Sequence, residues 1–137
     1  MSSLQVLVGV AGEQYALPVD NVLEVAEYGE VSPLPGAPAS VLGVRNVRGN
    51  VLAVLDLAKV FAIERAGSPE RIAIVELDGR KAGLAVDSVI GVEHLPDTSE
   101  EVESTHLVGA TLHDGALVGV VDVRSVLDVV QKAIARG

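Results

Sequence analysis

The sequence predicts a mainly β fold, in which two sets of about five short strands close into small antiparallel barrels. One observation behind this fold class is that short runs of Val, Leu and Ile alternate with tight-turn sequences, as in β-hairpins. A second is an internal repeat, in which VLGVRNVRGNVLAVLDL (residues 41–57) matches LVGATLHDGALVGVVDV (residues 107–123). The same strand-turn-strand pattern is therefore present twice in the chain.

A second pair of blocks extends the repeat towards the N-terminus. ALPVDNVLEV (residues 16–25) matches GLAVDSVIGV (residues 83–92) at nearly the same offset. Chance rarely places two blocks in register, so we expect pseudo-repeat halves at about residues 4–66 and 70–130. A half of about 65 residues is marginal alone, so the halves are expected to fold together as one domain over residues 1–137.

The elements of the first half follow from alternation and turn residues. Residues 4–10 and 14–19 read as a hairpin, and a loop with three prolines occupies residues 29–40. Between them, Asp20 can begin a short helical turn, although the Val-rich end of that segment could equally be extended. A second hairpin follows at residues 41–57, and Asp56 is expected to cap a short helix that ends at Phe61.

The second half repeats this order with a longer helix. Hairpins are expected around Asp78-Gly79 and Asp114-Gly115, with an acidic loop between them at residues 93–106. Asp122 is the expected N-cap of a C-terminal helix at about residues 123–135. Apolar residues recur along one face of this helix, at Val123, Val126, Leu127, Val130 and Ile134.

Composition excludes several classes of function. The net charge is −9 and aromatic residues are 2%, so the chain repels polyanions and lacks stacking platforms for bases, which excludes nucleic acid. There is no cysteine, and no apolar run long enough to span a bilayer. The N-terminus lacks the basic region and long apolar core of a signal peptide. We therefore expect a cytoplasmic protein without direct membrane insertion.

No catalytic, metal or cofactor site is expected. The three histidines lack metal-ligand spacing, and no glycine pattern typical of a nucleotide cradle is present. One enzymatic alternative is a two-aspartate hydrolase that uses the repeated Asp56 and Asp122. These aspartates are not followed by the Thr-Gly or Ser-Gly that supports such a carboxylate. Helix capping is therefore the favoured role for both residues.

The difference between the two copies suggests a binding face. Arg45, Asn46 and Arg48 of the first copy are replaced in the second by Thr111, Leu112 and Asp114. An Arg beside a turn can pair with a partner's carboxylate, although from the residues alone a solvated Arg48 is the simpler reading.

Five other first-copy residues join this interpretation. Glu24 has Gly91 as its counterpart, so it either orients Arg48 or faces the partner itself. Val22 is core or the floor of a groove, and Val25 is interpreted as core. Gly43 and Gly49 recur in both copies, so backbone geometry is their expected role.

The stretch VSPLPGAPASVLGVRNVRGNVLAVLDL (residues 31–57) resembles the CheW-like family of bacterial chemosensory adaptors. The N-x-R-G block of Asn46, Arg48 and Gly49, and its spacing to Asp56-Leu57, are the most specific part of the match. The resemblance extends from about Leu4 to Leu127. It implies two SH3-like five-stranded β-barrel subdomains packed on a shared apolar core, with short helices and a C-terminal helix.

The resemblance also implies a function. Members of this family are non-enzymatic scaffolds that couple chemoreceptors to a CheA-type histidine kinase. The implied partners are the regulatory domain of that kinase and the cytoplasmic hairpin tip of a receptor, with possible ring assembly with related domains. Arg48, Glu24, Asn46, Val22 and Arg45 would then form the partner-binding site. An alternative within the family is a regulatory competitor that binds receptor but not kinase.

Overall fold

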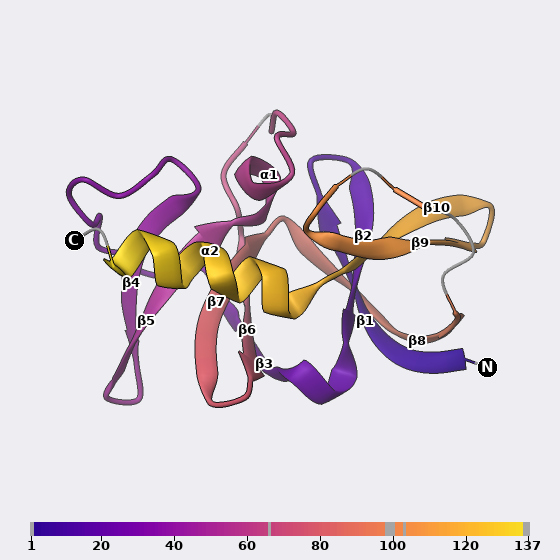
Figure 1. Cartoon of the computed structure of the whole chain (residues 1–137), viewed down its shortest axis with the longest axis horizontal. Coiled ribbons are helices and arrows are strands. Elements are labelled where there is room, and N and C mark those ends of the chain that lie inside the picture. The colour runs from indigo at the N-terminus through magenta and orange to yellow at the C-terminus, as the bar shows by residue number, and fades with distance from the viewer. Residues whose placement is uncertain (1, 66, 98–100, 103, 136–137) are drawn as a thin grey trace.

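Two five-stranded sheets lie side by side in the computed structural model, which describes residues 2–65, 67–97, 101–102 and 104–135 (Figure 1). Sheet A has the order β8 (Ser88–Pro96), β1 (Ser2–Val10), β2 (Glu13–Pro18), β10 (Ala116–Val121), β9 (Leu107–His113). Sheet B has the order β3 (Val22–Glu27), β6 (Arg71–Leu77), β7 (Arg80–Val86), β5 (Asn50–Asp56), β4 (Val41–Val47). The prediction of a mainly β fold with two sets of strands is confirmed.

The two sheets do not correspond to the two sequence halves, because the halves exchange strands. The hairpin β1–β2 of the first half joins β8, β9 and β10, and the hairpin β6–β7 of the second half joins β3, β4 and β5. The expected purely antiparallel pairing is wrong, since β2 pairs with β10 and β7 with β5 in parallel. The exchange gives each of these two hairpins a paired strand on both sides, and the edges of the sheets are β8 and β9 in sheet A and β3 and β4 in sheet B.

The helices begin at the aspartates that the sequence indicates. Asp56 accepts a hydrogen bond from the Ala58 amide at the start of α1 (Leu57–Val60), at 3.0 Å. Asp122 accepts one from the Ser125 amide at 3.2 Å, at the start of α2 (Val123–Ala135). No helix in the described part of the chain is long and apolar enough to cross a bilayer.

The structure contains both forms left open for the segment after Pro18, and it shortens the loop expected from Glu93. The segment after Pro18 makes a single 3-10 turn, Val19–Asn21, and then extends as β3. The loop expected from Glu93 begins later, because β8 continues to Pro96 along β1. Pairing with β1 supplies the backbone hydrogen bonds that outweigh the polar composition of residues 93–96.

The core lies mainly between the sheets. Its largest cluster draws residues from both sheets, and α2 crosses in front of sheet B and covers the cluster with Val123, Val126, Leu127, Val130 and Ala133 (Figure 1). Tyr15 of β2 stacks on Phe61 just after α1, with ring centroids 4.5 Å apart. Each sheet also encloses a smaller cluster of its own. The two sheets therefore form one folded unit.

Candidate partner-binding site

The turn between β4 and β5 places Arg48 in a left-handed backbone conformation. Its φ is 51° and that of Gly49 is 85°, and two consecutive positive values are what a tight two-residue hairpin turn requires. The matching turn of the second copy has almost the same backbone, with Asp114 at 50° and Gly115 at 79°. This conformation costs an Arg about 1 kcal/mol, and Asp or Asn less. The turn alone therefore does not account for Arg48.

Glu24 of β3 is the partner of the Arg48 side chain. The two form a hydrogen-bonded ion pair, with the Arg48 side chain 77% exposed and that of Glu24 29% exposed. One of the two roles left open for Glu24, orienting Arg48, is therefore present in the structure. The guanidinium keeps most of its surface in solvent and remains accessible to a second carboxylate.

Asn46 and Arg45 have partners inside the molecule. The side-chain oxygen of Asn46 accepts a hydrogen bond from the Gly49 amide at 2.9 Å and so supports the turn. Arg45 donates to the backbone carbonyls of Glu27 and Tyr28, the latter at 2.7 Å. Because β3 and β4 are the two edges of sheet B, Arg45 joins these edges where no strand pairing does.

Gly43 is required by a close approach of the loop before β4. Ser32 and Val44 exchange two backbone hydrogen bonds of 2.8 Å, which brings this loop against the strand. A Cβ on Gly43 would lie 2.1 Å from the Ser32 carbonyl oxygen, and the Gly43 φ of 151° disfavours other residues. Gly43 therefore acts through backbone geometry, and so does Gly49 in the turn.

A small hollow opens beside the Arg48–Glu24 pair at one end of sheet B. Its volume is about 90 Å³. The floor is apolar, with Leu52 and Ile74 from the inner cluster of sheet B, and the rim is charged. The complete lining is Leu23, Glu24, Val47, Arg48, Asn50, Leu52, Ile74 and Lys81. An apolar side chain flanked by a carboxylate has the chemistry to fit this hollow.

The interpretation of Val25 as core is wrong. Val25 is 40% exposed, whereas Val22 is partly buried and packs against the shared core. Burial alternates along β3, so Leu23, which is 50% exposed, shares the exposed face with Val25. Leu23, which the sequence interpretation omitted, therefore lines the hollow, and so does Lys81. Leu23 and Lys81 are identified as lining residues only by their position in the structure.

The repeated aspartates have separate partners, as capping requires. Asp56 is buried and binds Arg65 at 3.0 Å besides capping α1, while Asp122 caps α2. Tyr28 lies near the first pair; burial raises its pKa, and the charge of Asp56 raises it further against the opposite effect of Arg65. Among the described residues, no three His, Asp or Glu side chains gather as a metal site would need.

Arg65 lies outside the partner-binding site and is a buried ion-pairing residue that sequence reasoning missed. It lies in a segment that reads as a polar linker, yet its side chain is only 8% exposed and it binds Asp87 as well as Asp56. Ile63, two residues earlier, packs against the core. That position gives no signal in the sequence that the Arg65 side chain is buried.

Comparison with known proteins places the chain in one family. A family model described as CheW-like domain matches residues 5–131. The chain is 28% identical over 127 residues to the chemotaxis protein CheW of Rhizobium meliloti, covering 85% of this chain and 82% of that protein. It is 37% identical over 82 residues to protein FrzA of Myxococcus xanthus, covering 58% of this chain and only 51% of FrzA.

A solved structure agrees with both the fold and the family. The crystal structure of the scaffolding protein TtCheW from Thermoanaerobacter tengcongensis superimposes with a TM-score of 0.81 and 30% sequence identity. The match covers 89% of this chain and 85% of TtCheW. The similarity in fold between the two proteins therefore extends over almost the whole of this chain.

Proposed function

Because the chain belongs to the CheW-like domain family, we propose that it is a non-enzymatic adaptor coupling chemoreceptors to a CheA-type histidine kinase. The names of its relatives support a scaffolding role in chemotaxis signalling. As an adaptor of this kind it would work in the cytoplasm and reach receptor arrays only through its partners. Rings with related domains would follow from barrel-to-barrel pairing of the same surfaces.

One observation supports the receptor-binding role most directly. Arg48 occupies a backbone conformation that suits it poorly, and its exposed guanidinium stands with Glu24 at the rim of an apolar hollow. We assign Arg48 the direct contact with a carboxylate of the receptor hairpin tip, and Glu24 the role of orienting the Arg48 guanidinium. Asn46 holds the turn, Arg45 holds β3 against β4, and Val22 anchors β3, so these three act by positioning.

The kinase-binding surface is assigned to the outer face of β9–β10. Val108, Leu112 and Leu117 are 63%, 59% and 53% exposed there, close to a hollow of about 160 Å³ lined by Tyr15, Ala110 and Leu117. Apolar side chains this exposed, beside a recess, are typical of protein-binding surfaces. The receptor-binding site and the kinase-binding surface then lie on different sheets.

The test is a titration of the purified chain against two separate probes, a soluble receptor-tip fragment and the kinase regulatory domain. Arg48→Asp is expected to weaken receptor binding about tenfold or more, because a carboxylate then faces a carboxylate. Asp114→Asn changes the matching residue of the other turn and serves as the control with unchanged receptor binding. Leu117→Asp is expected to weaken kinase binding by a similar factor.

The outcomes separate the alternatives. Normal receptor binding by folded Arg48→Asp would refute the site assignment. Binding of the natural chain to the receptor fragment alone would favour the competitor that cannot recruit kinase. Binding to neither probe would refute the adaptor function for these partners.

A further inference from the structure

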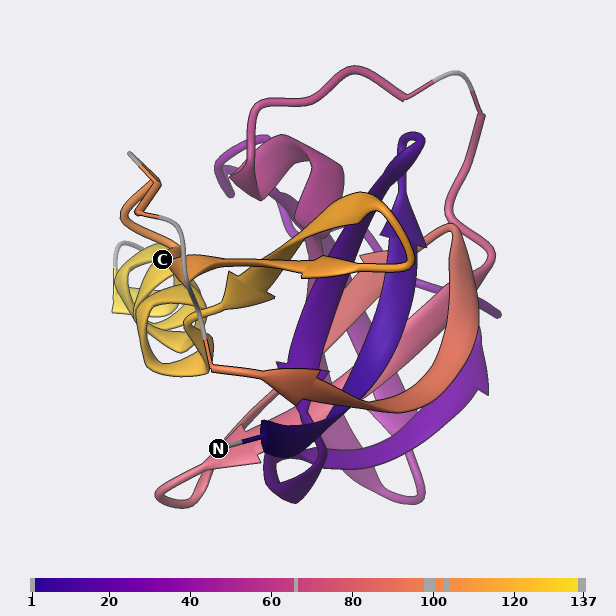
Figure 2. The ribbon, with the colours of Figure 1, turned by 90° about the vertical axis from the view of Figure 1, so that its right-hand side faces the viewer.

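The segment between α1 and β6, described at residues 61–65 and 67–70, arches over the turn of the first hairpin (Figure 2). We propose that this segment, called the clasp below, links the β1–β2 turn of sheet A to the end of β5 in sheet B. Arg65 forms the ion pairs that hold it in place. The clasp is a conformational device separate from the partner-binding surfaces described above.

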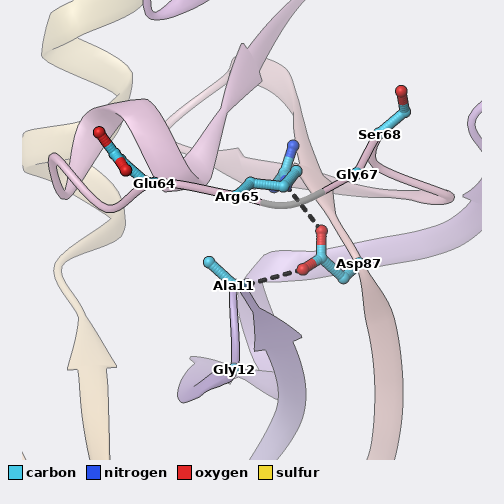
Figure 3. A pocket seen from close by; sticks show the side chains of 7 residues that line it. All are labelled: Ala11, Gly12, Glu64, Arg65, Gly67, Ser68 and Asp87. Atoms are coloured by element: carbon cyan, nitrogen blue, oxygen red, sulfur yellow. Dashed lines mark hydrogen bonds and ion pairs between the residues drawn. The ribbon is translucent and has the colours of Figure 1, made fainter.

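The Arg65 guanidinium is a single cation shared by two carboxylates. Arg65 Nη1 lies 3.0 Å from Asp56 Oδ1, and Arg65 Nε lies 2.8 Å from Asp87 Oδ1. The second Asp87 oxygen accepts a hydrogen bond of 2.6 Å from the Ala11 amide (Figure 3). Asp56 ends β5 of sheet B, Ala11 lies in the β1–β2 turn of sheet A, and Asp87 is the residue between β7 and β8. These contacts therefore run without a break from one sheet to the other.

Because Arg65 and Asp56 are buried, the ion pairs are sensitive to substitution of Arg65. The side chains of Arg65 and Asp56 are each 8% exposed, so each needs its counter-charge. Removing Arg65 would leave two carboxylates facing each other across the junction, one of them buried. Arg48, by contrast, is 77% exposed and its loss leaves Glu24 in contact with solvent.

The clasp is loosely packed around the Arg65 side chain. Hollows of about 290 Å³ and 400 Å³ lie on its two sides, and Arg65 lines both. The three guanidinium nitrogens of Arg65 and Asp87 Oδ1 are buried without hydrogen-bond partners among the described residues, so Arg65 holds the two carboxylates by ion pairing. Segments with few apolar contacts and adjoining voids open at low free energy. Within residues 61–65 and 67–70, Phe61 and Ile63 supply apolar contact with the core, and Arg65 supplies the ion pairs that close the clasp.

Hydrogen exchange of the full chain tests the clasp without any partner. In Arg65→Met, amides of residues 61–65 and 67–70 and of the turn at Ala11 are expected to exchange about tenfold faster, since a buried ion pair is lost. Amides of β6 and α2 are expected to keep their natural rates. Arg71→Met, which removes an exposed Arg at the start of β6, is the matched control. Unchanged exchange in both the segment and the turn would overturn the proposal.

Two further variants keep the test decisive if Arg65→Met unfolds. Arg65→Lys keeps the charge but replaces the guanidinium fork with one nitrogen, so the same local opening is expected. Adding Asp87→Asn to Arg65→Met removes one of the two repelling charges and should restore part of the protection. Uniformly faster exchange over all strands in every one of these variants would assign Arg65 to global stability and refute a local clasp.

The consequence for signalling rests on the proposed function. If the receptor-binding site and the kinase-binding surface lie on different sheets, the clasp sets their relative orientation. Arg65→Lys is then expected to bind each probe as the natural chain does, but to lose the effect of one probe on the affinity for the other. An unchanged effect would refute this consequence, whereas no binding by the natural chain would refute the proposed function and leave the exchange result intact.

Discussion

The hairpins β4–β5 and β9–β10 occupy the same place in their sheets, and their turns have similar backbone conformations. Their side chains differ in chemistry. Both turns have positive φ at two consecutive residues, Arg48-Gly49 and Asp114-Gly115. In the first, Arg45, Asn46 and Arg48 all form polar contacts within sheet B. In the second, Thr111 is buried and Leu112 projects into solvent.

The comparison separates what the fold needs from what it merely permits. Glycine follows the positive-φ residue in both turns, so glycine there is a requirement of the turn. The side chains differ in kind, giving a charged rim with a small hollow on one sheet and an exposed apolar face on the other. One duplicated unit thus supplies two unlike surfaces, as a coupling protein would need.

The largest expected effect comes from breaking the first hairpin's contact with its loop. Gly43→Val should lower the free energy of unfolding by about 3 kcal/mol or more, because its Cβ would overlap the Ser32 carbonyl. Gly67→Ala is the control, since nothing lies within 4 Å of the added methyl group. Urea unfolding measures both, and equal midpoints would show that the loop gives way without cost.

A smaller effect of opposite sign is expected in the inner cluster of sheet A. Gln5 and Thr111 are 6% and 1% exposed, and Gln5 Oε1 and Thr111 Oγ1 are buried without partners among the described residues. Thr111→Val keeps the shape, removes the unpaired oxygen, and should raise the free energy of unfolding by about 1 kcal/mol. Thermal unfolding detects this as a higher Tm. A lower Tm would mean that the hydroxyl has an unseen partner, such as water.

The repeat provides a comparison for that prediction. Ile72 of sheet B takes the place that Gln5 has in sheet A, and it belongs to an inner cluster that is fully apolar. Gln5→Leu should therefore also stabilise the fold, and its effect should add to that of Thr111→Val only if the two side chains do not touch.

The smallest expected effect concerns the turn residue itself. Arg48→Asn relieves the left-handed conformation by about 1 kcal/mol but loses an exposed ion pair worth about 0.5 kcal/mol. The net change in unfolding free energy should be slightly favourable, by roughly 0.5 kcal/mol. Asp114→Asn should change nothing measurable. A clear loss of stability in Arg48→Asn would mean that Glu24 needs Arg48 for folding, and the pair would then be structural.

The sequence allowed the turns, the helix caps and most strands to be placed, because these depend on neighbours along the chain. Asp56 and Asp122 cap helices, and the Gly49 turn has its expected form. The exchange of strands between halves could not be read, since both copies offer equivalent edges and the pattern within a strand does not specify its partner. For the same reason the exposure of Val25 and Leu23 on β3 was not foreseen.

The candidate site was located in outline and corrected in detail. Differences between the copies singled out Arg48 and Glu24, which do meet in space. They also singled out Arg45 and Asn46, whose partners turned out to be backbone groups of the same molecule. Arg65 has no counterpart that comparison of the copies could reveal, and its burial depends on two aspartates distant in sequence.

The exchange of strands between the two sheets has a consequence for how such a chain is made and how it arose. The first half leaves the ribosome as a hairpin and three strands that belong to different sheets, so it can complete neither sheet by itself. Sheet B can close once β7 is synthesised, and sheet A only after β10. A single copy of the repeat would meet the same obstacle unless two identical chains traded hairpins. The present molecule has the topology of such a strand-swapped pair joined end to end, which makes its assembly independent of protein concentration.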